Sequence, residues 1–155
     1  MVGRLEVCIA EAEADAVPAV SAEATHPLVW GAARAMWRDG HYRQAVAGAA
    51  EALVGQLKSR TGRSGISETA LWQEAFSERA PETGKPRLRW PGDPTDRTVR
   101  SMNDGLRSIT AGVQMTIRNP AAHETEQWTL VEASERLAVL SLIARWLETC
   151  VIDEV

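Results

Sequence analysis

The segment from Leu137 to Leu147 constrains the fold more than any other part of the sequence. Its residues, LAVLSLIARWL, are apolar around almost the whole circumference of a helix. A helix of this kind either lies at the centre of a bundle or is covered by a second chain. We therefore expect a final helix over about residues 130–152, either at the core of a helical bundle or at a subunit interface.

Apolar residues also recur at helical spacing along most of the remaining chain, and they predict an all-α fold. Three of the expected helices cover residues 3–16, 41–60 and 67–76. Another begins at Pro27 and stops at Asp39-Gly40. A long helix begins after its cap at Thr95 or Asp96 and breaks at Asn119-Pro120. The helix over residues 41–60 is rich in alanine and glycine, so a neighbouring helix can approach it closely. Residues 80–95 contain four prolines and two glycines, which predicts one long irregular loop. Alternation typical of a strand is limited to Leu88 and Trp90.

The length and composition are those of one ordinary domain. The chain has 155 residues, of which 45% are apolar and 25% charged, and these values exclude wholesale disorder. We divide it into a short N-terminal helix and linker over residues 1–24 and a helical domain over residues 25–155. The acidic N-terminus predicts no secretory signal, and no apolar run is long enough to cross a membrane. Cys8 and Cys150 lack metal-ligand spacing, so we expect free thiols in a cytoplasmic protein.

The net charge of −4 hides a basic segment between Arg79 and Arg118. This segment contains eight basic and four acidic residues, which gives it a charge of +4 and leaves −8 for the rest of the chain. Lysine and arginine are the residues that bind nucleic-acid phosphates. The segment is compatible with a phosphate-binding cleft, and also with a solvated loop and helix face.

The sequence RNPAAH at positions 118–123 is the strongest candidate for a functional motif. Asn119 is a good N-cap and Pro120 a good first-turn residue, so a new helical turn is expected to begin there. Arg118 then ends the preceding helix, His123 lies one turn into the next, and both side chains can face the same space across a tight joint. The structural alternative is that Arg118 only meets the helix dipole and His123 only forms a local hydrogen bond.

This motif, placed between a long helix and a final leucine-rich helix, resembles the signature of the HEPN superfamily. The resemblance is closest to its Ymh-like branch of prokaryotic and phage proteins and covers about residues 25–150, with further matches at His26-Pro27, Gly40-His41-Tyr42, Phe76 and Asp104-Gly105. It implies a HEPN-like bundle of four to five helices that forms a homodimer, with the arginine and histidine of both chains facing one cleft. Carried over to this sequence, Arg118 and His123 are the catalytic pair, and Asn119 is the polar neighbour that orients them.

The same resemblance implies two activities. One is a metal-independent endoribonuclease of a toxin or phage-defence system, for which an antitoxin or another defence protein would be a partner. The other is a non-catalytic dimer that binds RNA or a nucleotide.

RNA cleavage through the 2′-hydroxyl suits these residue types. The reaction needs a base for the 2′-hydroxyl proton, an acid for the departing 5′-oxygen, and positive charge near the phosphorus. Histidine can carry out either proton transfer, and arginine offers a planar charged fork to the phosphoryl oxygens. One chain offers only one such pair, so a symmetric dimer would supply both acid and base. No cluster of metal-ligating residues has suitable spacing, so we expect neither a metal nor another cofactor.

Outside the motif, Lys85, Arg87, Arg89 and Trp90 are the candidates for RNA contacts. Their basic side chains can bind phosphates and the indole can stack on an unpaired base; the alternative is a loop with one tryptophan packed on the bundle. A third interpretation of the whole chain is a purely structural helical dimer. That interpretation predicts that the motif's arginine or histidine is buried in an ion pair within one chain, whereas both RNA-directed interpretations predict that the two are accessible.

Overall fold

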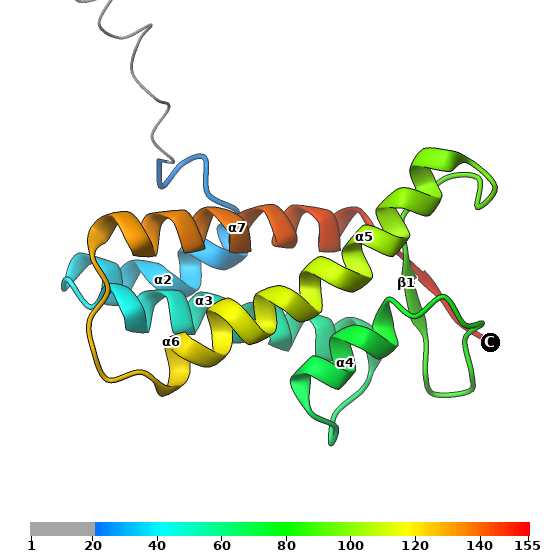
Figure 1. Ribbon diagram of the computed structural model, residues 1–155, viewed down its shortest axis with the longest axis horizontal. Helices are drawn as coiled ribbons and strands as arrows, with labels where there is room; N and C mark the ends of the chain where they lie inside the picture. The colour runs from blue at the N-terminus through cyan, green and yellow to red at the C-terminus, as the bar shows by residue number, and fades with distance from the viewer. Residues whose placement is uncertain (1–20) are drawn as a thin grey trace, which may run out of the picture.

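The computed structural model describes residues 21–155, which are mostly helical (Figure 1). The α-helices are α2 (Pro27–Arg38), α3 (Tyr42–Thr61), α4 (Glu68–Ala75), α5 (Arg97–Val113), α6 (Asn119–His123) and α7 (Leu130–Thr149). A π-helical segment, η1 (Gln114–Arg118), joins α5 to α6, and the strands β1 (Arg87–Arg89) and β2 (Val151–Asp153) form a small antiparallel sheet. The all-α prediction is confirmed apart from this sheet, and the helix predicted over residues 3–16 lies outside the described residues.

Start and stop signals in the sequence set several helix boundaries as predicted. Gly40 and Gly62 follow α2 and α3 with φ angles of 77° and 65°, a backbone conformation that residues other than glycine rarely adopt. Ser67 caps α4 by accepting a hydrogen bond from the backbone N–H of Ala70 (3.3 Å). Asp96, rather than Thr95, caps α5, because its carboxylate accepts from two backbone N–H groups of the first turn (2.8 and 3.1 Å).

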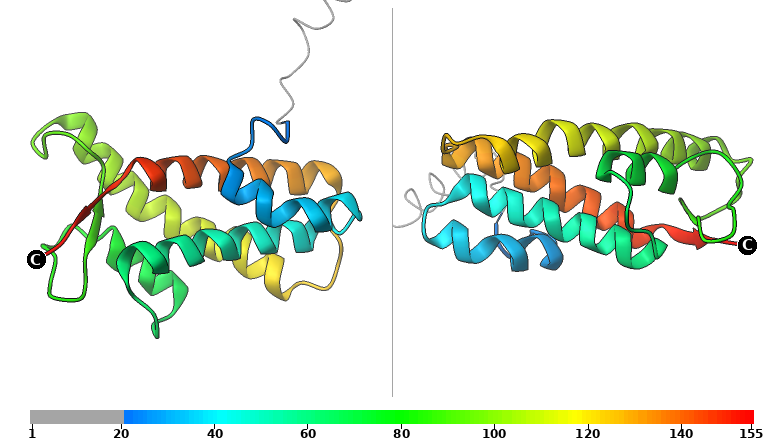
Figure 2. Two further views of the ribbon diagram at one scale, coloured as in Figure 1. Left: turned by 180° about the vertical axis from the view of Figure 1, so that it is seen from behind. Right: turned by 90° about the horizontal axis from the view of Figure 1, so that it is seen from below.

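Helix α3 is the central element of the bundle. It contacts α2, α4, α6, α7 and η1, and Figure 2 shows it between its neighbours when the molecule is seen from below. The side chains of Leu53 and Leu57 are almost fully buried in this core. A Cβ atom at Gly48 would lie 3.2 Å from the carbonyl oxygen of Ala32 on α2. The small residues of α3 therefore permit the close helix approach that the sequence predicts.

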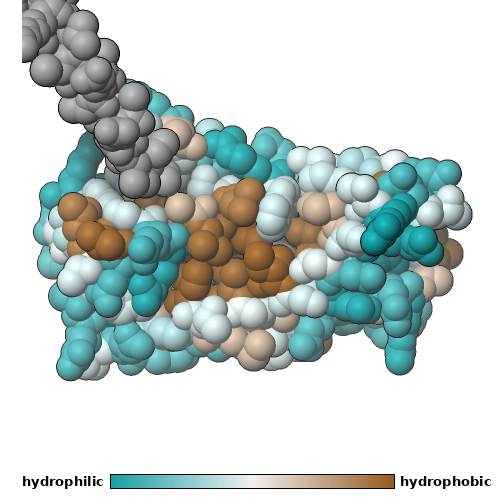
Figure 3. Space-filling model, turned by 45° about the horizontal axis from the view of Figure 1, so that its top comes forward, coloured by the Kyte–Doolittle hydropathy of each residue, from teal (hydrophilic) through white to brown (hydrophobic). Residues whose placement is uncertain are grey.

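Helix α7 packs one side on α2 and α3 and leaves its other side partly uncovered. The buried side includes Leu140 and Leu147, whereas Leu142 on the outer side is 43% exposed. Its position excludes the prediction that α7 is the centre of the bundle. Ile109 on α5 is also exposed (37%). We call the surface around Leu142 and Ile109 the α5–α7 face, and Figure 3 shows apolar side chains gathered across the middle of it.

The two strands are the main departure from the predicted elements. Strand β1 lies within the segment predicted as an irregular loop, and β2 replaces the end of the final helix, which stops at Thr149. Arg87 pairs with Asp153, Leu88 with Ile152, and Arg89 with Val151. Strands of three residues carry too little alternation for their pairing to be recognised in a sequence. The two strands lie at the end of the bundle opposite α6 (Figure 1).

None of the helices described here has both the length and the apolar character needed to cross a membrane.

Candidate functional site

The long helix continues through the RNPAAH motif instead of breaking there. Asn119 has helical φ and ψ angles of −63° and −49°, so the prediction that it caps a new helix is wrong. Proline lacks an N–H group and its ring collides with the carbonyl four residues earlier in a regular α-helix. The π-helical turn relieves this conflict: the backbone N–H of Asn119 donates to the carbonyl of Gln114, five residues back. A wider turn just before Pro120 therefore keeps the helix continuous.

Continuity of the helix separates Arg118 from His123. Five residues of an α-helix correspond to a rotation of roughly 140° around the axis. The side chains of residues 118 and 123 therefore leave the helix in different directions. The predicted joint between two helices is therefore absent, and a shared space for the two side chains stays a prediction. His123 is exposed at the end of α6 and makes neither a hydrogen bond nor an ion pair with any described residue.

The side chain of Arg118 is directed inward and is paired with two carboxylates. It is 20% exposed, and its Nη2 lies 2.6 Å from Oε1 of Glu51 on α3. Its Nε lies 3.0 Å from Oε2 of Glu68 on α4, although the N–H at Nε is not aligned to donate to any described acceptor. Ion pairing within one chain is what the structural interpretation predicts for this arginine. His123 is accessible, as the RNA-directed interpretations require, but those interpretations require both residues to be accessible, so the pairing of Arg118 counts in favour of the structural interpretation.

Glu68 connects this ion pair to the buried core. Its Oε2 accepts a hydrogen bond from Nε2 of Gln114 (2.9 Å), whose Oε1 accepts from the indole N–H of Trp72 (3.2 Å). Its other oxygen lies 3.6 Å from Nζ of Lys58. We call Glu51, Glu68, Gln114 and Arg118 the Arg118 network. The network ties both ends of η1 to α3 and α4, so the π-helical turn is held in a fixed place.

The sequence analysis missed the partners of the motif on α3. Glu51 is the one acidic residue in the run AVAGAAEALV, and this isolated charge is the signal that marks it. Nη1 of Arg43 donates to the carbonyl of Ala121 on α6 (2.6 Å). Nε of Arg43 and Oε1 of Gln44 are buried without a partner among the described residues. Asn119 is half-buried, and its side chain makes no hydrogen bond to the described residues, so it does not orient Arg118 within one chain.

Arg87, predicted to bind RNA, is the first residue of β1, and its side chain is buried against the loop that precedes the strand. It is 3% exposed, and its guanidinium donates to the carbonyl oxygens of Arg79 (3.3 Å), Lys85 (3.1 Å) and Ala80 (3.3 Å). A guanidinium used in this way holds the loop together and is withdrawn from solvent. The predicted phosphate contact therefore does not fit the position of Arg87.

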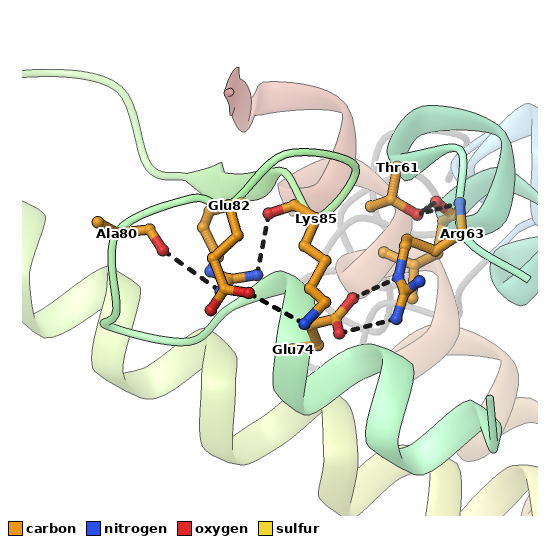
Figure 4. Close-up of polar contacts among 8 residues, drawn as sticks. Thr61, Arg63, Glu74, Ala80, Glu82 and Lys85 are labelled. Atoms are coloured by element: carbon orange, nitrogen blue, oxygen red, sulfur yellow. Dashed lines mark hydrogen bonds and ion pairs between the residues drawn. The ribbon is translucent and has the colours of Figure 1, made fainter. Parts of the chain in front are cut away.

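Lys85 and Arg89, the other basic candidates, are largely occupied by neighbours. Nζ of Lys85 lies 3.0 Å from Oε2 of Glu82, and this contact lowers the pKa of the Glu82 carboxyl. Figure 4 shows Lys85 directed at Glu82 and, beside them, Arg63 donating two hydrogen bonds to Glu74 (2.7 and 3.0 Å). Arg89 donates to the carbonyls of residues 77 and 79 and lies 3.6 Å from Oδ2 of Asp153. Burial lowers the pKa of Arg89, against the opposing effect of Asp153.

Three exposed arginines of the basic segment remain without an ion pair to the described residues: Arg79, Arg97 and Arg100. The charge of +4 in this segment is therefore not gathered in one cleft.

Trp90 is half-buried, packs against the core and lines a pocket of about 680 Å³ at the strand end of the bundle. The structure thus brings Arg89, Arg100 and Trp90 together, but it places them at the opposite end of the long helix from His123.

The fold and the site define a class: a helical bundle that carries an arginine–histidine motif where a π-helical turn joins α5 to α6. The family model described as "Protein of unknown function (Hypoth_ymh)" matches residues 23–147, and the chain belongs to this family. The match confirms the Ymh-like part of the resemblance found in the sequence. No curated protein and no solved structure matches the chain. Among the described residues, no group of three or more histidine, cysteine, aspartate or glutamate side chains could hold a metal ion.

Proposed function

We propose that this protein is a HEPN-like, metal-independent endoribonuclease that cleaves RNA through its 2′-hydroxyl, in the cytoplasm, as an effector of a toxin or phage-defence system. The observation that carries the proposal is the exposed imidazole of His123, five residues after an anchored arginine on the same helix. An accessible histidine is suited to proton transfer, which contributes about 10²–10⁴-fold to the rate of such reactions. A histidine that only closed a helix would gain nothing from this exposure.

Arg118 would stabilise the negative charge that develops on the phosphate. Glu51 and Glu68 hold its Nη2 and Nε sides, and its Nη1 makes no hydrogen bond to the described residues, so the Nη1 donors are available. The Glu51 carboxylate is 55% exposed, and an ion pair on the solvent side is worth only about 0–1 kcal/mol. A phosphodiester can therefore compete with Glu51 for the guanidinium, while Glu68 keeps the side chain oriented.

A second copy of the chain would complete the site. One chain supplies a single histidine, whereas the reaction uses an acid and a base, so the two histidines of a symmetric dimer would divide these roles. The α5–α7 face supports dimer formation because it leaves the large apolar side chains of Ile109 and Leu142 exposed to solvent. A stable two-fold interface there would bury at least about 1,000 Å² in total.

The test is cleavage of total RNA in the presence of EDTA, with the ends of the products analysed. The proposal predicts 2′,3′-cyclic phosphate ends, and it predicts that His123→Ala lowers the rate by about 10²-fold or more. His41→Ala is the matched control, because His41 is also exposed and its side chain caps no helix. Equal loss of cleavage in both variants, or products with 5′-phosphate ends, would contradict the proposal.

The second candidate function is an RNA- or nucleotide-binding dimer without catalysis. Pairing of Arg118 with two carboxylates weakens its catalytic role, whereas the exposed arginines at positions 79, 97 and 100 form no ion pair with the described residues and remain able to bind phosphate. This candidate predicts salt-dependent RNA binding by the wild-type protein, with no cleavage in the same buffer.

A further inference from the structure

A well-formed pocket lies at the strand end of the bundle, away from the RNPAAH motif. Its volume is about 680 Å³, within the range of sites that hold small ligands. It is formed by four parts of the chain: Glu78 after α4, the start of α5, the loop over residues 90–94, and β2 with Arg89 beside it. These parts are joined by the pairing of β1 with β2, so the pocket is built by the fold and not by one mobile loop.

The lining combines a flat aromatic ring with an oriented amide. Trp90 is half-buried and lines the pocket together with apolar residues such as Val99 and Ile152. Oδ1 of Asn103 accepts a hydrogen bond from the backbone N–H of Trp90 (2.8 Å). This contact fixes the orientation of the amide, so Nδ2 of Asn103 is the donor left for a ligand.

The charged groups of the lining leave one cation without a carboxylate partner. Asp153 is paired with Arg89 (3.6 Å), whereas Glu78 and Asp104 both lie near Arg107, at 3.6 and 3.7 Å. Arg100 is exposed, lines the pocket and forms no ion pair with the described residues. The pocket therefore offers a single free guanidinium beside an aromatic ring and an amide donor.

We propose that this pocket binds one nucleotide unit, with its base against Trp90, a base acceptor on Nδ2 of Asn103, and its phosphate on Arg100. Flat aromatic rings stack on bases, and guanidinium groups bind phosphate through charge-assisted hydrogen bonds. The proposal deepens the RNA-directed function and rests on it for biological meaning. Residue 103 and Arg118 are 15 positions apart on one continuous helix, which corresponds to roughly 20 Å along its axis. The pocket would therefore hold an RNA strand away from the position that is cleaved.

Equilibrium binding of nucleoside monophosphates tests the pocket without any cleavage. AMP and UMP contain no phosphodiester bond, so isothermal titration calorimetry with these probes reads binding alone. We expect saturable binding by at least one of the two, and binding weaker by about tenfold or more for Arg100→Ala. Arg97→Ala is the matched control because Arg97 is exposed on the same helix but does not line the pocket; its affinity should change by less than about twofold.

Further arms separate the nucleotide from its parts and from a strand. Adenosine and inorganic phosphate should each bind more weakly than AMP, because each lacks one of the two recognised groups. Asn103→Asp keeps the acceptor for the Trp90 N–H, so the fold is retained, while the amide donor is lost and binding should weaken. A short RNA with a 2′-fluoro substitution at every position cannot be cleaved through a 2′-hydroxyl; tighter binding of this strand than of AMP, lost in Arg100→Ala, would identify the nucleotide within a strand as the ligand.

Several results would overturn the proposal. These are no saturable binding of AMP or UMP, phosphate binding as strong as that of AMP, or equal weakening by Arg97→Ala and Arg100→Ala. Nucleotide binding in a protein that cleaves no RNA would reject the ribonuclease and keep the pocket. Cleavage in a protein that binds no mononucleotide would reject the pocket and keep the ribonuclease.

Discussion

Replacing Arg87 by alanine tests whether this residue supports the fold or binds RNA. Its side chain is nearly inaccessible, with an exposed fraction of 3%. Its guanidinium donates to three backbone carbonyls of the loop before β1. The substitution removes all three hydrogen bonds and leaves a space where the side chain was buried.

The expected loss of stability follows from these contacts. A hydrogen bond that involves a charged group contributes about 1.5–3 kcal/mol to stability, and this amount is lost when the donor is removed. The three acceptors belong to exposed or half-buried residues, so water can replace part of each contact, and we use about 1 kcal/mol for each. The buried aliphatic part of the side chain adds about 1 kcal/mol. The free energy of unfolding should fall by about 3–4 kcal/mol, which lowers the Tm of a chain of this length by about 6–16 °C.

Thermal and urea unfolding followed by circular dichroism would measure this loss. Arg79→Ala is the matched control: the residue is exposed in the same loop and its side chain forms no ion pair with the described residues, so the change should stay within about 0.5 kcal/mol. The reasoning would be refuted if Arg87→Ala unfolded like Arg79→Ala and only its affinity for RNA fell. In that case the side chain would be available to phosphate, as the sequence alone predicts.

Other predictions concern the thiol, the α5–α7 face and the Arg118 network. Burial raises the pKa of the Cys150 thiol to about 11, so in a Cys8→Ser background it should be alkylated by iodoacetamide at neutral pH at less than about a hundredth of the rate of the unfolded chain. The unfolded thiol ionises near pH ~8.5 and the folded one only at higher pH, so the free energy of unfolding should fall as pH rises from about 9 to 11. The Cys150→Ala variant should lack this part of the fall. The same pH profile in wild type and variant would refute the link between this thiol and stability. Leu142→Glu should give a monomer by light scattering at micromolar concentration, whereas Met36→Glu on α2, equally exposed, should leave a dimer; a wild-type monomer would contradict the proposed dimer. Glu51→Gln should tighten RNA binding measured by fluorescence polarisation at fixed salt, since it removes the charge that competes for Arg118, and weaker binding would contradict this competition.

The helices are the part of the fold that the sequence predicts well, because their signals are local. Apolar spacing and the glycines after residues 39 and 61 lie within one or two turns of the structure they determine. The predicted crowding of α2 against α3 is also local in origin, since it follows from the absence of a side chain at Gly48. Helix α7 is a partial success. Its apolar character is real, but only the packing of α3 against five neighbours decides which helix is central.

The features that the sequence does not predict depend on residues far apart in the chain. The sheet joins residues 87–89 to residues 151–153; the alternation at Leu88 and Trp90 marks the position of β1, but nothing local marks β2 or the pairing of the two strands. The π-helical turn depends on Pro120 together with the anchoring of Gln114 by Trp72 and Glu68. A proline after an asparagine fits a helix start equally well from local rules, so the motif was placed at a break. This single difference turns Arg118 inward and leaves His123 alone at the surface.

The proposal that two chains share one catalytic site is tested most directly by mixing active and inactive subunits. Equal amounts of wild-type and His123→Ala protein would be allowed to exchange subunits, and RNA cleavage would be measured in EDTA at constant total protein. If acid and base come from the two histidines of one dimer, only wild-type homodimers cleave, and the activity should fall to about one quarter of the unmixed wild-type value. An activity of about one half would mean that each chain carries a complete site, and the two-chain account would be wrong.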